Sequence, residues 1–185
     1  MTLSLARLGL MGGGVSGSLK FISEITMDGT ASSYSFTSIQ ESTYNVHFIT
    51  AQDVTLPSVN GDRLKLRFIE SGTIETSSVY DYASQQNSPA GHNESKSNNS
   101  DNLTFIKNTG TNARSNSNGQ MYIYNAGNSS TYTFNSYHST TTDQSLNYYS
   151  WFGSGHMHQT STVNGFNFFS SGNITGTLRL YGVSA

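Results

Sequence analysis

The sequence predicts an all-β protein, an antiparallel β-sandwich of jelly-roll type with about 8–10 strands. Two observations favour this fold class. Apolar and polar residues alternate with a period of two along many short segments, and no segment carries an apolar stripe with helical spacing. The chain is also polar without being charged: charged residues are 11% of the total, against roughly 25% in an ordinary soluble domain. Aromatic residues make up 12% and supply the apolar area for a core.

The same composition excludes several classes of function. Nine basic and eleven acidic residues give a net charge of −2, so the chain has no basic excess for a phosphate backbone, and nucleic acid is not an expected partner. The absence of Cys excludes disulfides and thiolate nucleophiles. No apolar run approaches the ~18 residues of a membrane span. The first ten residues lack a basic region and are interrupted by Arg7, so we expect no secretory signal and assembly in a cytoplasm.

The chain divides into two parts, an arm at 1–17 and a single sandwich domain at 18–185. The arm is rich in leucine and ends in a glycine hinge at 12–14. Because a short apolar arm cannot fold alone, we predict that it docks on a neighbouring subunit. The alternative is a frayed terminus, or a strand that packs on its own domain. The residues that we expect to make the docking contact are Leu3, Leu5, Leu8, Leu10 and Met11.

Alternation and turn residues place the strands within the domain. The first runs over 19–27 and ends at a turn of Asp28 and Gly29. Further strands are predicted at 33–37, 44–50, 63–68, 73–82, 103–107, 121–124, 131–137, 157–169 and 174–183. The last two are predicted to form a closing hairpin over 160–183, with its turn at 170–173.

Three polar stretches are predicted to be loops. The longest, 83–101, consists mostly of Ser, Asn, Gln and Gly, and we expect it to face outward. The other two lie at 109–118 and 139–147.

The sequence shows no catalytic motif. The triplet Gly153-Ser154-Gly155 lacks the pattern of a nucleophile elbow, and nothing marks two carboxylates as a facing pair. His156 and His158 have a spacing that suits a metal on one face of a strand, but no third ligand lies nearby in the sequence, so two outward histidines are expected. The chain is predicted not to be an enzyme and to need no cofactor or metal.

Two groups of residues are candidates for binding. Tyr149, Trp151 and His156 lie beside polar loops and could form a stacking platform for a glycan or a contact with a partner; alternatively, these aromatic residues fill the core and its rim. Three cations alternate over 63–67, and we expect them to pair with Glu24, Glu41 or Glu75 rather than with an acidic neighbour.

The C-terminal stretch resembles a known type of protein. It reads Thr162-Val-Asn-Gly165-Phe-Asn-Phe-Phe169, then a short polar turn, then Ile174-Thr-Gly-Thr-Leu-Arg-Leu-Tyr-Gly-Val183. This ending resembles that of virion-associated β-domain proteins of tailed phages, especially those of marine bacteria and cyanobacteria. In outline the resemblance covers 19–183, and it is tight over about the last twenty residues. At 69–72 the chain departs from the N-G-D turn that is frequent in such proteins.

The resemblance implies a non-enzymatic component of a virion, assembled in the host cytoplasm. On this hypothesis the chain is a capsid decoration or cement protein, or a short fibre or tail appendage subunit. Its partners would be the major capsid protein or tail proteins and further copies of itself, for example in a trimer. The alternative is a lectin-like carbohydrate-binding module for adhesion to the host surface. No catalytic residues follow from the resemblance.

Overall fold

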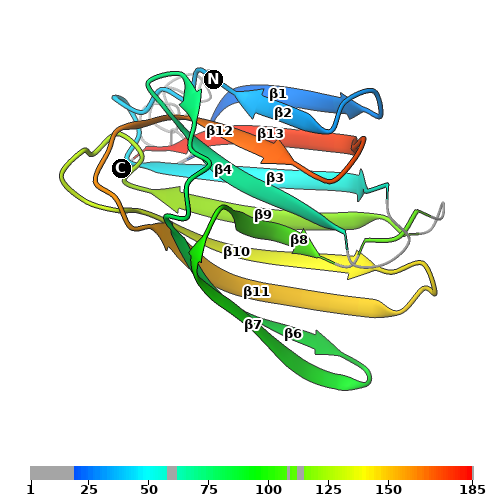
Figure 1. Cartoon of the computed structure of the whole chain (residues 1–185). Coiled ribbons are helices and arrows are strands. Elements are labelled where there is room, and N and C mark those ends of the chain that lie inside the picture. Colours follow the sequence, from blue (N-terminus) through cyan, green and yellow to red (C-terminus); the bar gives the residue numbers. More distant parts are fainter. Residues whose placement is uncertain (1–18, 58–61, 108, 112–114, 185) are drawn as a thin grey trace, which may run out of the picture.

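The computed structural model describes residues 19–57, 62–107, 109–111 and 115–184, which form thirteen strands and no helix (Figure 1). No helix that could cross a membrane occurs among these residues. Eight strands form a large sheet: β1 (Leu19–Asp28), β3 (Val46–Thr55), β6 (Tyr80–Ser88), β7 (Gly91–Ser100), β9 (Ser117–Tyr124), β10 (Thr133–Thr142), β11 (Tyr148–Met157) and β13 (Thr175–Val183). A small sheet contains β2 (Ser33–Phe36), β4 (Arg63–Glu70), β5 (Thr73–Ile74), β8 (Leu103–Lys107) and β12 (Val163–Phe169).

The two sheets pack face to face, which confirms the predicted antiparallel β-sandwich. The strand order in the large sheet is β1-β13-β3-β9-β10-β11-β6-β7. The strand order in the small sheet is β2-β12-β4, and both β5 and β8 pair with β4. More strands form than predicted, because β7 and β11 were not predicted and the strand predicted at 73–82 divides into β5 and β6.

The predicted closing hairpin is wrong in its pairing. Both strands exist, but β12 pairs with β2 and β4 in the small sheet, whereas β13 pairs with β1 and β3 in the large sheet. The segment between them is therefore a crossover from one sheet to the other. The backbone N–H groups of Ser170 and Ile174 donate to the carbonyls of Ser32 and Ala31, which anchors both ends of this crossover.

The predicted loop at 83–101 is also wrong, because this segment belongs to a hairpin of β6 and β7. The two strands pair from Tyr80 and Ser100 down to Ser88 and Gly91. The hairpin lies at the edge of the large sheet and extends past the small sheet (Figure 1). Most of β7 is exposed, so it needs no apolar side chains. The predicted loop at 139–147 is likewise shortened, since β10 continues to Thr142.

The core between the sheets is built from apolar side chains that alternate along each strand. In the small sheet, Leu64, Leu66 and Phe68 of β4 are fully buried beside Phe166 and Phe168 of β12. On the large sheet they meet residues such as Ile49, Met121, Leu178 and Leu180. Phe105 of β8 contacts Phe168 in its own sheet and Tyr137 of the large sheet, at centroid distances of 6.1 and 6.3 Å.

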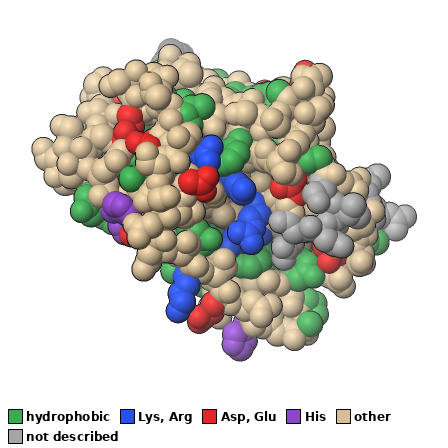
Figure 2. Space-filling view, viewed as in Figure 1, with side chains coloured by type: hydrophobic (Ala, Val, Ile, Leu, Met, Phe, Trp, Pro, Cys, Tyr) green, Lys and Arg blue, Asp and Glu red, His purple; other side chains and the backbone are tan. Residues whose placement is uncertain are grey.

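The alternating cations of β4 point away from this core. Lys and Arg side chains gather near the middle of the face in Figure 2, over the small sheet. Arg67 pairs with Asp101, and both Arg67 and Lys65 lie over the ring of Phe169. The predicted partners were therefore wrong: none of the three expected glutamates pairs with a described cation of β4, and Glu24 pairs with Arg179 instead.

Candidate functional site

The outer face of the large sheet, the one turned away from the core, carries the most distinctive group of side chains. Strand alternation decides which residues reach it. In β13, Leu178 and Leu180 are buried in the core, so Arg179 and Tyr181 point outward. The register then aligns Tyr181 with Phe21 of β1 on one side and Phe48 of β3 on the other.

Exposed and half-buried rings form a band on this outer face, which we call the aromatic band. Its members come from six adjacent strands or their ends: Phe21, Phe48, Tyr122, Tyr124, Tyr132, Phe134, His156 and Tyr181.

Ring contacts connect most neighbours in the band. Tyr181 lies 5.8 Å from Phe21 and 6.2 Å from Phe48, measured between ring centroids. Phe48 lies 4.7 Å from Tyr122, and Tyr122 stacks with Tyr124 at 6.2 Å. Such contacts hold each ring in place.

The end of the aromatic band on β11 is formed by the imidazole of His156. Tyr124 is aligned with Phe134 of β10, and Phe134 with His156 of β11. The imidazole of His156 stacks almost parallel on Tyr132, with 5.5 Å between centroids and 11° between planes. His156 thus lies on the outer face, in contact with two exposed rings.

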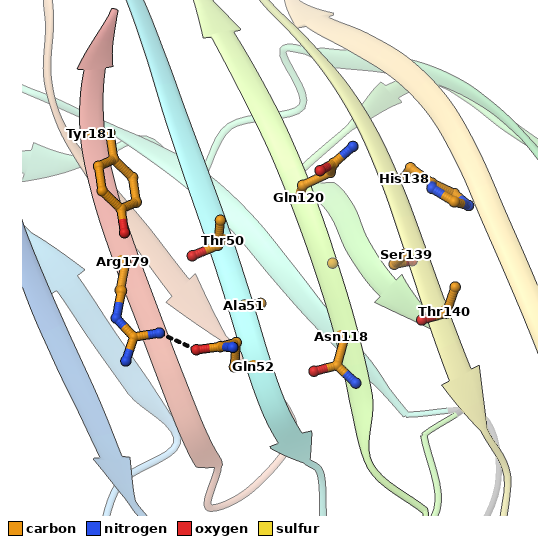
Figure 3. Close-up of a pocket in the computed structure, with 11 residues that line it drawn as sticks. Thr50, Ala51, Gln52, Asn118, Gln120, His138, Ser139, Thr140, Arg179 and Tyr181 are labelled. Carbon is orange, nitrogen blue, oxygen red and sulfur yellow. Dashed lines mark hydrogen bonds between the residues drawn. The ribbon is translucent and has the colours of Figure 1, made fainter. Parts of the chain in front are cut away.

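A shallow polar hollow runs beside the aromatic band (Figure 3). It encloses about 490 Å³. Its polar side chains stand on four adjacent strands: Thr50, Gln52, Asn118, Gln120, His138, Thr140 and Arg179. Tyr181 belongs to both the band and the lining of the hollow, which makes the two features continuous.

Hydrogen bonds position the larger polar groups of the hollow. The guanidinium of Arg179 donates to the carboxylate of Glu24 at 2.6 Å and to the amide oxygen of Gln52 (Figure 3). His138 shares a hydrogen bond of 2.9 Å between its Nε2 and the hydroxyl of Ser150. The amides of Asn118 and Gln120 provide both donors and acceptors along the floor.

In strand β10 the apolar and polar residues are partly reversed between the two faces, which stability alone does not explain. Phe134 points outward and is 42% exposed, whereas Thr133, Asn135 and Ser139 are buried on the core side. A sequence chosen only for stability would place the phenyl ring inside and the polar groups outside. Such reversals of a local rule are expected at functional sites.

The structure separates the three residues that were predicted to form a platform. Tyr149 and Trp151 are at odd positions of β11 and point toward the core, whereas His156 is at an even position and points outward. Trp151 is only 5% exposed, with the ammonium of Lys107 4.4 Å from its ring, so it offers no open face. The hydroxyl of Tyr149 donates to Asp143 at 3.1 Å. The platform as predicted is therefore wrong.

Asp81 of β6 lies beside the histidine end of the band. Its Oδ2 is 3.6 Å from Nε2 of His156 and 3.4 Å from Nδ1 of His158. The backbone N–H of Asn99, which donates to this carboxylate, is the main group that lowers the pKa of Asp81, and His158 and His156 lower it further. Over the described ranges, no group of three or more His, Asp or Glu side chains is placed to hold a metal ion.

The predicted docking residues Leu3, Leu5, Leu8, Leu10 and Met11 lie outside the described residues. Most members of the band and the hollow were not predicted as site residues. The available signal was apolar residues at both odd and even positions of β3 and β9, which indicates strands with rings on both faces.

Comparison with known proteins gives little further guidance. No family model matches the chain, and no curated protein matches it. Among solved structures, the CBM2 module of the evolved Dit protein of Lactobacillus casei BL23 phage J-1 aligns with a TM-score of 0.25 and 10% identity, over 83% of this chain and 70% of that chain. A likeness at this TM-score carries no argument about fold or function.

Proposed function

We propose that this chain is a non-enzymatic virion protein of a tailed phage that binds a glycan on the outer face of its large sheet. The observation that carries the binding role is the aromatic band beside the polar hollow. Sugar rings expose apolar C–H faces and a rim of hydroxyls. Aromatic rings that are held in place can stack on the C–H faces, and amide, imidazole and hydroxyl groups can form hydrogen bonds with the sugar hydroxyls.

The chemistry of the hollow supports binding rather than catalysis. Its described lining contains no Asp or Glu, so it lacks the pair of carboxylates that glycoside hydrolysis uses. The lining is also open to solvent along its length, whereas catalytic sites gain from excluding water.

The resemblance of the C-terminal stretch supports the virion setting. Within a particle the chain would act as a decoration or cement protein or as a short fibre or tail appendage subunit, assembled with other copies and with capsid or tail proteins. An outward glycan-binding face favours a role in host attachment. Antibody labelling of purified particles tests this setting, because a protein absent from particles would contradict it.

Replacing Tyr122 with Ala should weaken glycan binding by about tenfold, since the ring lies mid-band and one stacking contact of about 1.4 kcal/mol corresponds to that factor. The measurement is titration calorimetry with a glycan identified on an array. Tyr148→Ala is the matched control, because Tyr148 is an exposed tyrosine of β11 that lies outside the band and the hollow. Equal losses in both variants, or an intact protein that binds no glycan on the array, would contradict the proposal.

A further inference from the structure

The aromatic band has a direction and a length. It crosses β1, β13, β3, β9, β10 and β11 in spatial order, so it runs across the strands rather than along one of them. Neighbouring strands lie about 4.8 Å apart, so six strands give a band of about 24 Å. A single sugar ring would cover only a small part of this length. The band therefore suits an extended oligosaccharide chain.

The charge that Arg179 brings to the hollow is already paired. Arg179 is the only Lys, Arg, Asp or Glu among the described residues that line the hollow. Its Nε donates to Glu24 and its Nη1 to Gln52. Because Glu24 is the register partner of Arg179 on the edge strand β1, the pair is held by the sheet itself.

The opposite end of the band is no more favourable to an anion. The charged group nearest to His156 is the carboxylate of Asp81, which also lies close to His158. A uronic acid placed there would meet the negative charge of Asp81. At the Arg179 end a uronic acid would meet a guanidinium whose positive charge Glu24 already balances, so the carboxylate would lose hydration on binding and gain little in return.

We infer that the ligand of this face is a neutral oligosaccharide that lies along the aromatic band, across the strands. This inference rests on the proposed glycan-binding function and names its substrate class. The ion pair of Glu24 and Arg179 is then a specificity device: it keeps Arg179 from recruiting acidic sugars.

The test uses glycans that share a backbone and differ in charge: glucan and glucuronan, galactan and galacturonan, mannan and mannuronan. For the intact protein, we expect the neutral member of the bound pair to bind at least tenfold more tightly than the acidic member. Affinity should rise with chain length and level off once the chain spans the band. A preference for the acidic member, or full affinity for a monosaccharide, would overturn the inference while leaving glycan binding itself in place.

A charge-neutral substitution tests the specificity device directly. Glu24→Gln frees the guanidinium of Arg179, and we expect affinity for the acidic member to rise about tenfold and to fall again with added salt. The double variant Glu24→Gln, Arg179→Gln is the control and should lose this gain. An unchanged affinity of Glu24→Gln for the acidic glycan would overturn the role given to the pair.

A different result would contradict the proposed glycan-binding function itself. If the intact protein binds no member of any pair, and Tyr122→Ala instead abolishes self-association in analytical ultracentrifugation, the band is an interface between copies of this chain. Both the glycan-binding function and the inference would then be overturned.

Discussion

Replacing Phe168 with Ala should lower the free energy of unfolding by about 3–5 kcal/mol, the range found for a large aromatic side chain removed from a packed core. Phe168 is fully buried at the centre of the sandwich. Its ring lies 6.3 Å from that of Phe36 in β2 and 6.1 Å from that of Phe105 in β8, between centroids. The loss would therefore loosen contacts of several strands at once. Urea denaturation followed by fluorescence measures the change.

The matched control is Phe152→Ala. Phe152 is 43% exposed on the outer face of β11, and we expect a change within about 0.5 kcal/mol. If the two variants were equally destabilised, the assignment of inward and outward faces in the large sheet would be wrong.

The stability of the protein should rise by about 1.5 kcal/mol between pH 8 and pH 9.5, because of Lys107. This side chain is 1% exposed, and its described contacts are the hydroxyl of Ser84 and the rings of Tyr82 and Trp151. Burial, aided by the positive charge of Arg63, lowers the pKa of Lys107 to about 8 from its ordinary 10.5.

The direction follows from the protons bound in each state. Above pH 8 the folded protein has released the proton of Lys107, while the unfolded chain keeps it up to about pH 10.4. The unfolded state then binds more protons, so the free energy of unfolding increases with pH. Near pH 10 the trend reverses, because burial raises the pKa of Tyr137 to about 12 and tyrosines of the unfolded chain ionise first.

Lys107→Met keeps most of the side-chain volume and removes the titrating amine. Urea denaturation at pH 7, 8, 9 and 9.5 should show the rise in the natural protein and a flat profile in this variant. A profile for the natural protein as flat as that of the variant would show that Lys107 keeps an ordinary pKa in the fold.

The sequence predicted the strands at both ends of the domain well, but it could not predict how they pair. The strand that begins at 19 and the turn at Asp28 and Gly29 are confirmed by β1 and by the positive φ of 82° at Gly29. The last two strands were also found, yet they belong to different sheets. The alternation of apolar and polar residues indicates that one face of a strand is apolar, but it does not indicate which strand pairs with it.

The β6–β7 hairpin escaped prediction for a different reason. Residues 91–100 contain almost no apolar side chains, so the period-two signal is missing. The hairpin lies where the small sheet no longer covers the large one, so β7 is held by backbone hydrogen bonds to β6 and its side chains remain in water. A strand without a buried face leaves no hydrophobic pattern to detect.

Most of the candidate site was missed because alternation alone does not say which of the two faces of a strand lies against the core. Along β3, Val46 and Phe48 alternate with His47, and the structure shows that the buried residues are His47, Ile49 and Ala51. For Trp151 both a surface contact and a place in the core were considered, and the structure places it in the core. His156 alone among the predicted contact residues lies in the aromatic band.

The most direct test of a glycan-binding outer face is to map the contact by NMR. The backbone amide signals of the labelled protein would be followed while a neutral oligosaccharide that binds on the array is added. We predict that the shifts concentrate in β13, β3, β9 and β10, around Tyr181, Phe48, Tyr122 and His138. Shifts confined to the small sheet, or to the turn between β6 and β7, would contradict the account.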